Sequence, residues 1–120
     1  MKVLLVEDDV TLRTLYKEIF THNNFDVLEA GDGEEGVSVT LAQEPDAVVL
    51  DLMLPRQGGM RTLKILRSHP ETKHLPIIIL TALPNPEYQT QTKNLVQGFY
   101  HKTEIKPQEL VEKVKALLKG

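Results

Sequence analysis

The sequence predicts a three-layer α/β domain: a doubly wound, five-stranded parallel sheet of strand order 2-1-3-4-5, flanked by five helices. Short apolar runs alternate with helical patterns along the chain, which is typical of parallel βαβ units. Residues 47–50 and 77–80 are apolar at every position, as expected for strands that are covered by helices on both faces. Polar residues follow such runs at their carboxyl ends, where ligands bind in these folds.

The five strands and five helices are expected in strict alternation. The expected strands cover residues 2–6, 26–30, 47–50, 77–80 and 98–101, and the expected helices cover 10–22, 34–42, 60–68, a short segment within 84–96, and 107–119. The first two helices are expected to bury Leu12, Leu15, Ile19, Val37 and Leu41. A loop is expected at Pro84-Asn85-Pro86, because proline restricts the residue before it and removes a donor. The helix that follows has the weakest pattern, since residues 89–92 have poor helix propensity and few apolar positions.

Length and composition limit the function classes. A chain of 120 residues predicts one domain spanning residues 1–120. The net charge of -3 argues against direct nucleic-acid binding by this chain, since phosphate contacts need a basic face. Arg61, Lys64 and Arg67 make only a mildly basic helix face, which is expected to be solvated. There are no cysteines, and no apolar run approaches the ~20 residues of a membrane span, so a cytoplasmic protein with no membrane contact is expected.

Acid, hydroxyl and amine side chains follow four of the expected strands. Glu7 and Asp8 follow the first strand, Asp51 the third, Thr81 the fourth and Lys102 the fifth. Carboxylates brought together in one cleft need a compensating charge, and Mg²⁺ is the hard cation that binds few carboxylates and bridges to phosphoryl oxygens. An aspartate in such a site can act as a nucleophile towards phosphorus.

These residues lie within motifs that extend over nearly the whole chain. The motifs are Leu-Val-Glu-Asp-Asp at 5–9, Pro-Asp-Ala-Val-Val-Leu-Asp at 45–51, Met-Leu-Pro at 53–55 with Gly59, Pro-Ile-Ile-Ile-Leu-Thr-Ala at 76–82, and Lys102. Together, and in this order, they resemble the receiver domain of two-component response regulators, which has a flavodoxin-like fold.

The resemblance implies one phosphorylation site. Asp51 would be the phosphoacceptor, and Thr81 and Lys102 would bind its phosphoryl group. Mg²⁺ would be bound by the side chains of Asp8 and Asp51, by the backbone carbonyl of Met53 and, through water, by Glu7. Mn²⁺ could substitute for Mg²⁺. No organic cofactor is implied.

The resemblance also implies partners and a switch. The phosphodonor would be a phosphohistidine on a sensor histidine kinase or a histidine phosphotransfer protein. Thr81 and Phe99 would be switch residues, altering a surface formed by the fourth helix, fifth strand and fifth helix that a downstream protein or output domain reads; a homodimer through this surface is a further expectation. Such a domain promotes its own phosphorylation rather than turning over a substrate, and apolar Met53 and Leu83 predict slow self-dephosphorylation.

Three alternatives remain open from the sequence. A phosphohydrolase of the haloacid-dehalogenase type also uses a strand-end aspartate, a hydroxyl, a lysine and Mg²⁺, but it needs a second acid where this chain has Met53. A phosphorylation-independent interaction module would retain the site without using it. The chain could also be part of a longer regulator with an output domain. The glycine pattern at 31–36 resembles a dinucleotide fingerprint, but its carboxylates would oppose a pyrophosphate.

Overall fold

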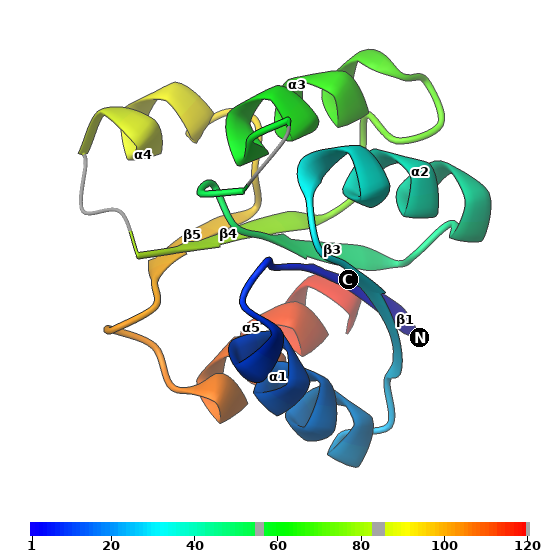
Figure 1. Cartoon of the computed structure of the whole chain (residues 1–120), viewed down its shortest axis with the longest axis vertical. Helices are drawn as coiled ribbons and strands as arrows, with labels where there is room; N and C mark the ends of the chain where they lie inside the picture. Colours follow the sequence, from blue (N-terminus) through cyan, green and yellow to red (C-terminus); the bar gives the residue numbers. More distant parts are fainter. Residues whose placement is uncertain (55–56, 83–85, 120) are drawn as a thin grey trace.

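The computed structural model describes residues 1–54, 57–82 and 86–119 and has the predicted alternation of strands and helices. The strands are β1 (Lys2–Val6), β2 (Asp26–Ala30), β3 (Ala47–Leu50), β4 (Ile77–Thr81) and β5 (Gly98–His101). The helices are α1 (Val10–His22), α2 (Gly33–Gln43), α3 (Gly59–Ser68), α4 (Pro86–Thr92) and α5 (Pro107–Lys119). All strand pairs are parallel, and the order β2-β1-β3-β4-β5 confirms the prediction (Figure 1).

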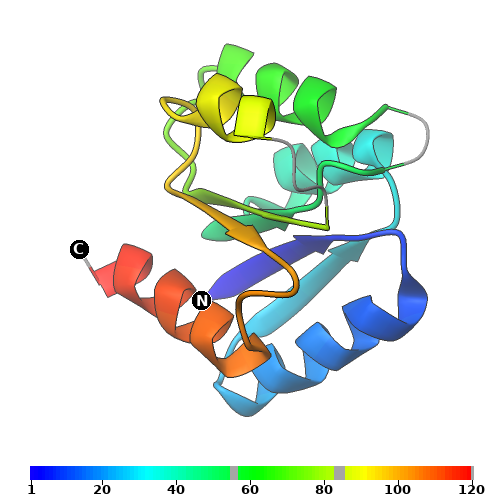
Figure 2. The same cartoon turned by 90° about the vertical axis from the view of Figure 1, so that its left-hand side faces the viewer.

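Helices cover both faces of the sheet. α1 and α5 lie on one face, and α2, α3 and α4 lie on the other (Figures 1 and 2). Alternate residues of each central strand point to opposite faces, so the sheet supports two apolar cores. In β1, Val3 and Leu5 belong to the core beneath α1 and α5, while Leu4 and Val6 belong to the core beneath α2 and α3.

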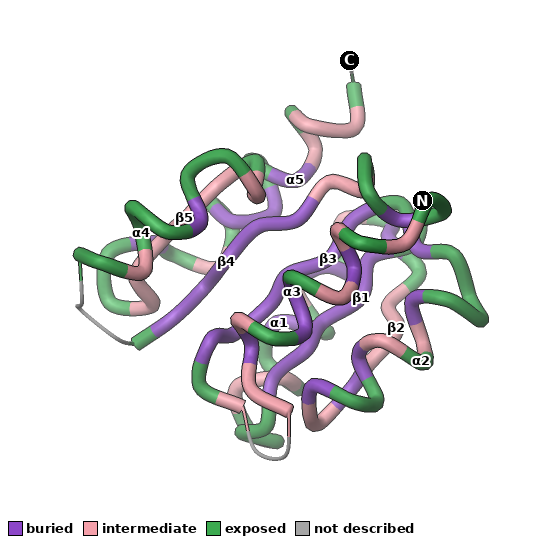
Figure 3. The backbone as a smooth tube through the Cα atoms, turned by 90° about the horizontal axis from the view of Figure 1, so that it is seen from above, coloured by how far each residue is buried: buried purple, intermediate pink, exposed green. Residues whose placement is uncertain are grey.

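The central strands are the most buried part of the chain. Every residue of β3 and β4 is buried, and Figure 3 shows these strands as purple segments beneath largely green and pink helices. Parallel strands with both faces covered are expected to read as continuous apolar runs. The two runs at 47–50 and 77–80 therefore occupy the positions that the sequence predicted.

Two predicted core positions are wrong. Leu15 is 44% exposed, and Leu41 is also exposed. On α1 the buried positions are instead Tyr16 and Phe20, because these aromatic side chains occupy the face towards the sheet one residue further along. On α2 the buried positions include Thr40, whose hydroxyl donates to the carbonyl of Gly36 at 2.7 Å, so a satisfied polar residue replaces the expected leucine.

The weakest helical prediction is confirmed as a short helix. α4 covers Pro86–Thr92, and Thr92 is buried with its hydroxyl donating to the carbonyls of Tyr88 and Gln89 at 2.8 and 3.3 Å. Pro86, predicted to belong to the preceding loop, instead begins α4, as the first turn of a helix tolerates proline. Leu83, Pro84 and Asn85 lie outside the described residues. Within residues 1–54, 57–82 and 86–119, no helix has the length and apolar character needed to span a membrane.

Candidate functional site

The tips of β1 and β3 place Glu7 and Asp51 at the same edge of the sheet. The two strands are neighbours, with Val6 opposite Leu50, so the next residue of each lies at the same level. Backbone hydrogen bonds continue past both strands: the Asp51 N–H donates to the Val6 carbonyl at 3.1 Å, and the Glu7 N–H donates to the Ala30 carbonyl at 3.0 Å. Both acidic residues are therefore held by the sheet itself.

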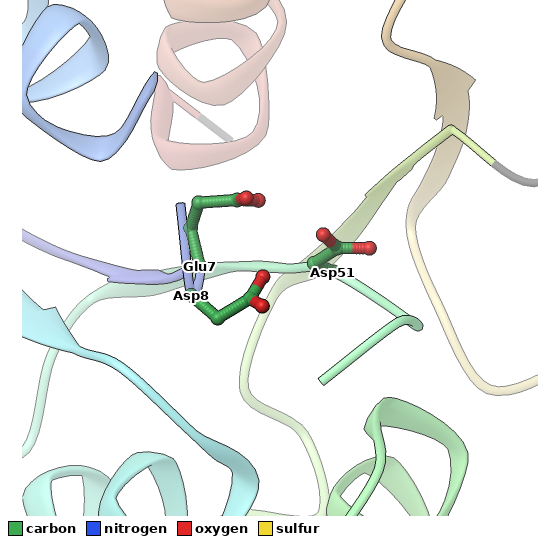
Figure 4. Close-up of side chains that lie close together, drawn as sticks. All are labelled: Glu7, Asp8 and Asp51. Carbon is green, nitrogen blue, oxygen red and sulfur yellow. The ribbon is translucent and has the colours of Figure 1, made fainter. Parts of the chain in front are cut away.

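Three carboxylates converge at this edge. Oxygen atoms of Glu7, Asp8 and Asp51 all lie within 4.8 Å of one another, and Figure 4 shows the side chains gathered around one space, with Asp8 extending from the end of β1 towards Asp51. Glu7 is 6% exposed and Asp51 is 3% exposed, whereas Asp8 is exposed. The cluster is thus open to solvent on the Asp8 side and closed behind it.

Lys102 joins the two buried acids. Its Nζ lies 2.8 Å from Glu7 Oε2 and 2.8 Å from Asp51 Oδ2, and its side chain is 16% exposed. The Lys102 N–H donates to the carbonyl of Thr81 at 2.9 Å, which ties the residue after β5 to the end of β4. The sequence predicted that these side chains would meet, and for Glu7, Asp51 and Lys102 the structure brings them into direct contact.

The pKa values of Glu7 and Lys102 reflect two opposing effects: burial, which disfavours the charged form, and pairing with an opposite charge, which favours it. Burial raises the pKa of Glu7 to about 7, and the neighbouring Asp51 also raises it, although the hydrogen bond from Lys102 acts in the opposite direction. For Lys102, burial alone would lower the pKa, but the hydrogen bonds and charges of Asp51 and Glu7 outweigh burial and raise it. The Lys102 ammonium is therefore too little to keep Glu7 fully ionised near neutral pH.

The Asp51 carboxylate also has a backbone partner. The N–H of Met53 donates to Asp51 Oδ1 at 3.0 Å, and the Met53 side chain is exposed. α3 begins close by: a Cβ added to Gly59 would lie 2.2 Å from the carbonyl oxygen of Asp51 and 2.4 Å from the Cα of Leu52. Only glycine allows the start of α3 to pack against the residue that carries the central carboxylate.

Thr81 and Phe99 lie on the two strands beside this cluster. Thr81 is fully buried at the end of β4. Phe99 is half-buried in β5 and packs against the core beneath α2, α3 and α4; its ring meets that of His101 edge to face, with centroids 5.7 Å apart. Phe99 also lines a groove with residues of α4, among them Gln89 and Thr92. Both predicted switch residues thus lie on the α4 side of the site.

Sequence reasoning missed two residues near the acids, Arg13 and Tyr16. Arg13 Nη1 donates to the backbone carbonyl of Glu7 at 2.6 Å. Tyr16 is buried beneath Glu7 and Asp51, and burial raises the pKa of its hydroxyl. A signal for Arg13 existed: a cation so near the start of a helix is unfavourable without a partner. For Tyr16 we find no such signal.

The donor set suits a hard divalent cation. Carboxylate oxygens are the ligands that Mg²⁺ prefers, and Mg²⁺ keeps several waters rather than filling an all-protein cage. An acidic group with one solvent-exposed member, Asp8, and two buried members, Glu7 and Asp51, provides both the oxygens and an open side. Thiolate and imidazole ligands, which favour other metals, do not form part of this cluster.

Comparisons with known proteins agree with this geometry. The family described as "Response regulator receiver domain" matches residues 3–115, and the chain belongs to this family. It is 36% identical over 118 residues to the transcriptional regulatory protein CpxR of Klebsiella pneumoniae, covering 98% of this chain and 49% of CpxR. It is 33% identical over 124 residues to the transcriptional regulatory protein SrrA of Staphylococcus aureus, covering 98% of this chain and 48% of SrrA.

A solved receiver domain has the same fold. The receiver domain of the Francisella response regulator 1452 superimposes with a TM-score of 0.89 at 32% identity, covering 98% of this chain and 96% of that one. The chain spans about half the length of the curated relatives it matches. Members of the receiver family are signalling domains of two-component systems, and this chain is one of them.

Proposed function

We propose that this chain is a phosphoacceptor domain in which Asp51 receives a phosphoryl group in a Mg²⁺-dependent reaction. The observation that carries the proposal is the convergence of three carboxylates and one ammonium on a single strand edge, with Asp51 buried at its centre. Membership of the receiver family supports the reaction class. We propose that residues 1–120 form one such domain.

Asp51 would act as the nucleophile. One of its carboxylate oxygens forms a bond to phosphorus while the P–N bond of a phosphohistidine breaks, and the electron pair of that bond goes to the imidazole nitrogen. Lys102, already 2.8 Å from Asp51 Oδ2, would bind an oxygen of the transferred group. The Thr81 hydroxyl, at the end of the neighbouring strand, would donate to another.

The cation site would consist of the Asp8 and Asp51 carboxylates and the Met53 carbonyl, with Glu7 acting through water. When bound, Mg²⁺ would offset the charge of the acids and of the incoming phosphoryl group; Mn²⁺ could substitute. The carboxylates within 4.8 Å of one another support this assignment. The role of the Met53 carbonyl comes from the family resemblance, since the contact that the structure provides is from the Met53 N–H.

Phosphorylation would be read at the surface formed by α4, β5 and α5. Thr81 and Phe99 would change position together, and Phe99 lines the groove beside α4, so a movement of its ring would reshape that groove. The partners that we propose are a sensor histidine kinase or histidine phosphotransfer protein as donor, and a downstream protein, an output domain or a second copy of this chain as reader. The chain would meet them in the cytoplasm and would not itself bind nucleic acid.

Intact mass spectrometry tests the proposal directly. The chain is incubated with phosphoramidate and Mg²⁺, and we expect a mass increase of one phosphoryl group that is abolished by Asp51→Asn and by EDTA. Asp26→Asn is a matched control, because Asp26 is an exposed aspartate at the opposite end of β2, and it should label as the wild type does.

Three outcomes would contradict the proposal. Labelling that survives in Asp51→Asn would place the phosphoryl group elsewhere. Steady release of inorganic phosphate from small phosphate esters, without a stable labelled species, would favour a phosphohydrolase. A wild-type chain that neither binds Mg²⁺ nor is labelled by phosphoramidate would instead be a phosphorylation-independent interaction module.

A further inference from the structure

Arg13 connects the acidic cluster to two other elements. It lies in the first turns of α1, and its side chain is only 18% exposed. Its Nη1 donates to the carbonyl of Glu7 at 2.6 Å, and its Nε donates to Glu29 Oε1 of β2 at 3.1 Å. The same guanidinium therefore spans from the β1–α1 turn to the neighbouring strand, using the fixed fork geometry that lysine lacks.

The Glu7 carbonyl belongs to the peptide that joins Glu7 to Asp8. The rest of the turn is already restrained: the Asp9 N–H donates to Glu7 Oε1 at 3.2 Å, and Asp9 accepts from the Leu12 N–H at 3.1 Å as the N-cap of α1. Asp8 lies between these fixed points, and its exposed carboxylate has the most freedom of the three acids. The orientation of the Glu7–Asp8 peptide helps to set the direction in which the Asp8 side chain leaves the backbone.

We propose that Arg13 is a positioning residue for the cation site, holding the Glu7–Asp8 peptide so that Asp8 faces Asp51. This inference rests on the proposed function, because it assigns Arg13 a part in the same Mg²⁺ site. Glu29 fixes the guanidinium in turn. Lys17, from the next turn of α1, also pairs with Glu29, with its Nζ 3.1 Å from Glu29 Oε2. Burial would raise the pKa of Glu29, but Lys17 and Arg13 outweigh burial and lower it.

The alternative role for Arg13 is purely electrostatic, and it predicts the opposite result. A positive charge near a cation site repels Mg²⁺, so removing it would tighten binding. The pairing of Arg13 with Glu29 offsets this repulsion, whereas no other contact replaces its hydrogen bond to the Glu7 carbonyl in the described residues. Positioning therefore outweighs repulsion, and loss of Arg13 weakens the site.

Isothermal titration with MgCl₂ separates the two roles. Arg13→Met keeps the length of the side chain without the donors, and Arg13→Lys keeps the charge but cannot reach both partners in the fork geometry. We expect both variants to raise the Mg²⁺ dissociation constant by about tenfold, the lower end for residues that orient metal ligands. Lys17→Met is the matched control, because it removes the other cation that pairs with Glu29. The Lys17 side chain is 48% exposed, and within the described residues its ammonium donates to Glu29 rather than to the turn at residues 7–9. This variant should change the constant by less than about twofold.

Phosphoramidate labelling provides a second readout. In Arg13→Met the Mg²⁺ concentration that gives half-maximal rate should rise by the same factor of about ten, while the rate at saturating Mg²⁺ approaches that of the wild type, because Asp51 and Lys102 are untouched. Tighter Mg²⁺ binding by Arg13→Met with unchanged binding by Arg13→Lys would overturn the inference in favour of electrostatics. Equal weakening by Lys17→Met would overturn it in favour of a general effect of the ion-pair group. If the wild-type chain itself bound no Mg²⁺, the proposed function would fail, which a wild-type titration shows separately.

Discussion

Replacing Lys102 with methionine tests how much stability the central ammonium contributes. Lys102 Nζ makes two contacts of 2.8 Å, to Glu7 and Asp51, and both acids are nearly inaccessible to solvent. Lys102→Met keeps the aliphatic stem and removes the charge. Breaking a buried ion pair by removing one partner costs about 3–5 kcal/mol, because it leaves an uncompensated charge.

A carboxylate without its cation can bind a proton instead, which limits the loss. Relative to an ordinary carboxyl with a pKa of about 4, keeping one protonated costs about 1.4 kcal/mol for each pH unit above that value. One uncompensated carboxylate can therefore lower the free energy of unfolding by at most about 5 kcal/mol at pH 7.5 and about 1.4 kcal/mol at pH 5. Glu7, with a pKa of about 7, is already partly protonated near neutral pH in the wild type, so the loss should be smaller than this limit. We expect Lys102→Met to lower the free energy of unfolding by about 3 kcal/mol at pH 7.5 and by about 1 kcal/mol at pH 5.

Urea denaturation followed by circular dichroism at the two pH values measures this difference in the absence of divalent cations. Lys17→Met is the control, since its exposed pair with Glu29 should contribute less than about 1 kcal/mol at either pH. Adding Mg²⁺ at pH 7.5 should restore part of the lost stability, because a cation that binds only the folded state stabilises it. A loss of the same size at both pH values, or a loss below about 1 kcal/mol at pH 7.5, would refute the argument that Lys102 compensates buried charge.

The packing at Gly59, the protonation of Glu7 and the apolar Met53 each give a further prediction. Gly59→Ala should destabilise the fold by about 3 kcal/mol or more and abolish labelling of Asp51, because the new Cβ meets backbone atoms; Gly58→Ala, with open space but a φ of +60°, should cost only about 1–3 kcal/mol and retain labelling. The pKa of Glu7 is raised from 4.5 to about 7, so stability without metal should fall as pH rises from 4.5 to about 7, and Mg²⁺ affinity measured by calorimetry should rise over pH 6–8 in the wild type but not in Glu7→Gln. Met53→Asn should speed decay of the phosphorylated chain in a mass-spectrometric time course; unchanged or slower decay would argue against slow hydrolysis set by an apolar Met53.

The sequence predicted the sheet well because parallel strands carry a strong signal. Continuous apolar runs as short as those at 47–50 and 77–80, bounded by polar residues and prolines, are typical of buried parallel strands. All strand pairs are parallel, so every carboxyl end lies at one edge of the sheet. The meeting of Glu7, Asp51 and Lys102 could therefore be predicted without coordinates. The site could be predicted because each of its polar residues directly follows an apolar run.

Helix faces were predicted less well because periodicity does not fix rotation to within one residue. On α1, Leu15 and Tyr16 are adjacent, and either stripe is consistent with an amphipathic pattern; the structure buries Tyr16 and exposes Leu15. Arg67 shows a second limit. It was expected on a solvated basic face, yet it is half-buried, and burial lowers its pKa. Its guanidinium donates to the carbonyls of Leu95 and Thr72 at 2.7 and 3.1 Å, and sequence patterns contain no information on which distant carbonyls need a donor.

The charges of the site explain why its residues act as a set. When ionised, three acids against one lysine leave two negative charges, which a proton on Glu7 offsets only in part and a divalent cation would offset fully. A phosphoryl group on Asp51 would add negative charge at the position where Lys102 now binds, and would draw Lys102 and Thr81 towards it. Because the Lys102 N–H is bonded to the Thr81 carbonyl at 2.9 Å, neither residue can shift far without the other. Phe99 lies on β5, three residues before Lys102, which directly follows that strand, so the change in charge would reach the groove beside α4 through β5.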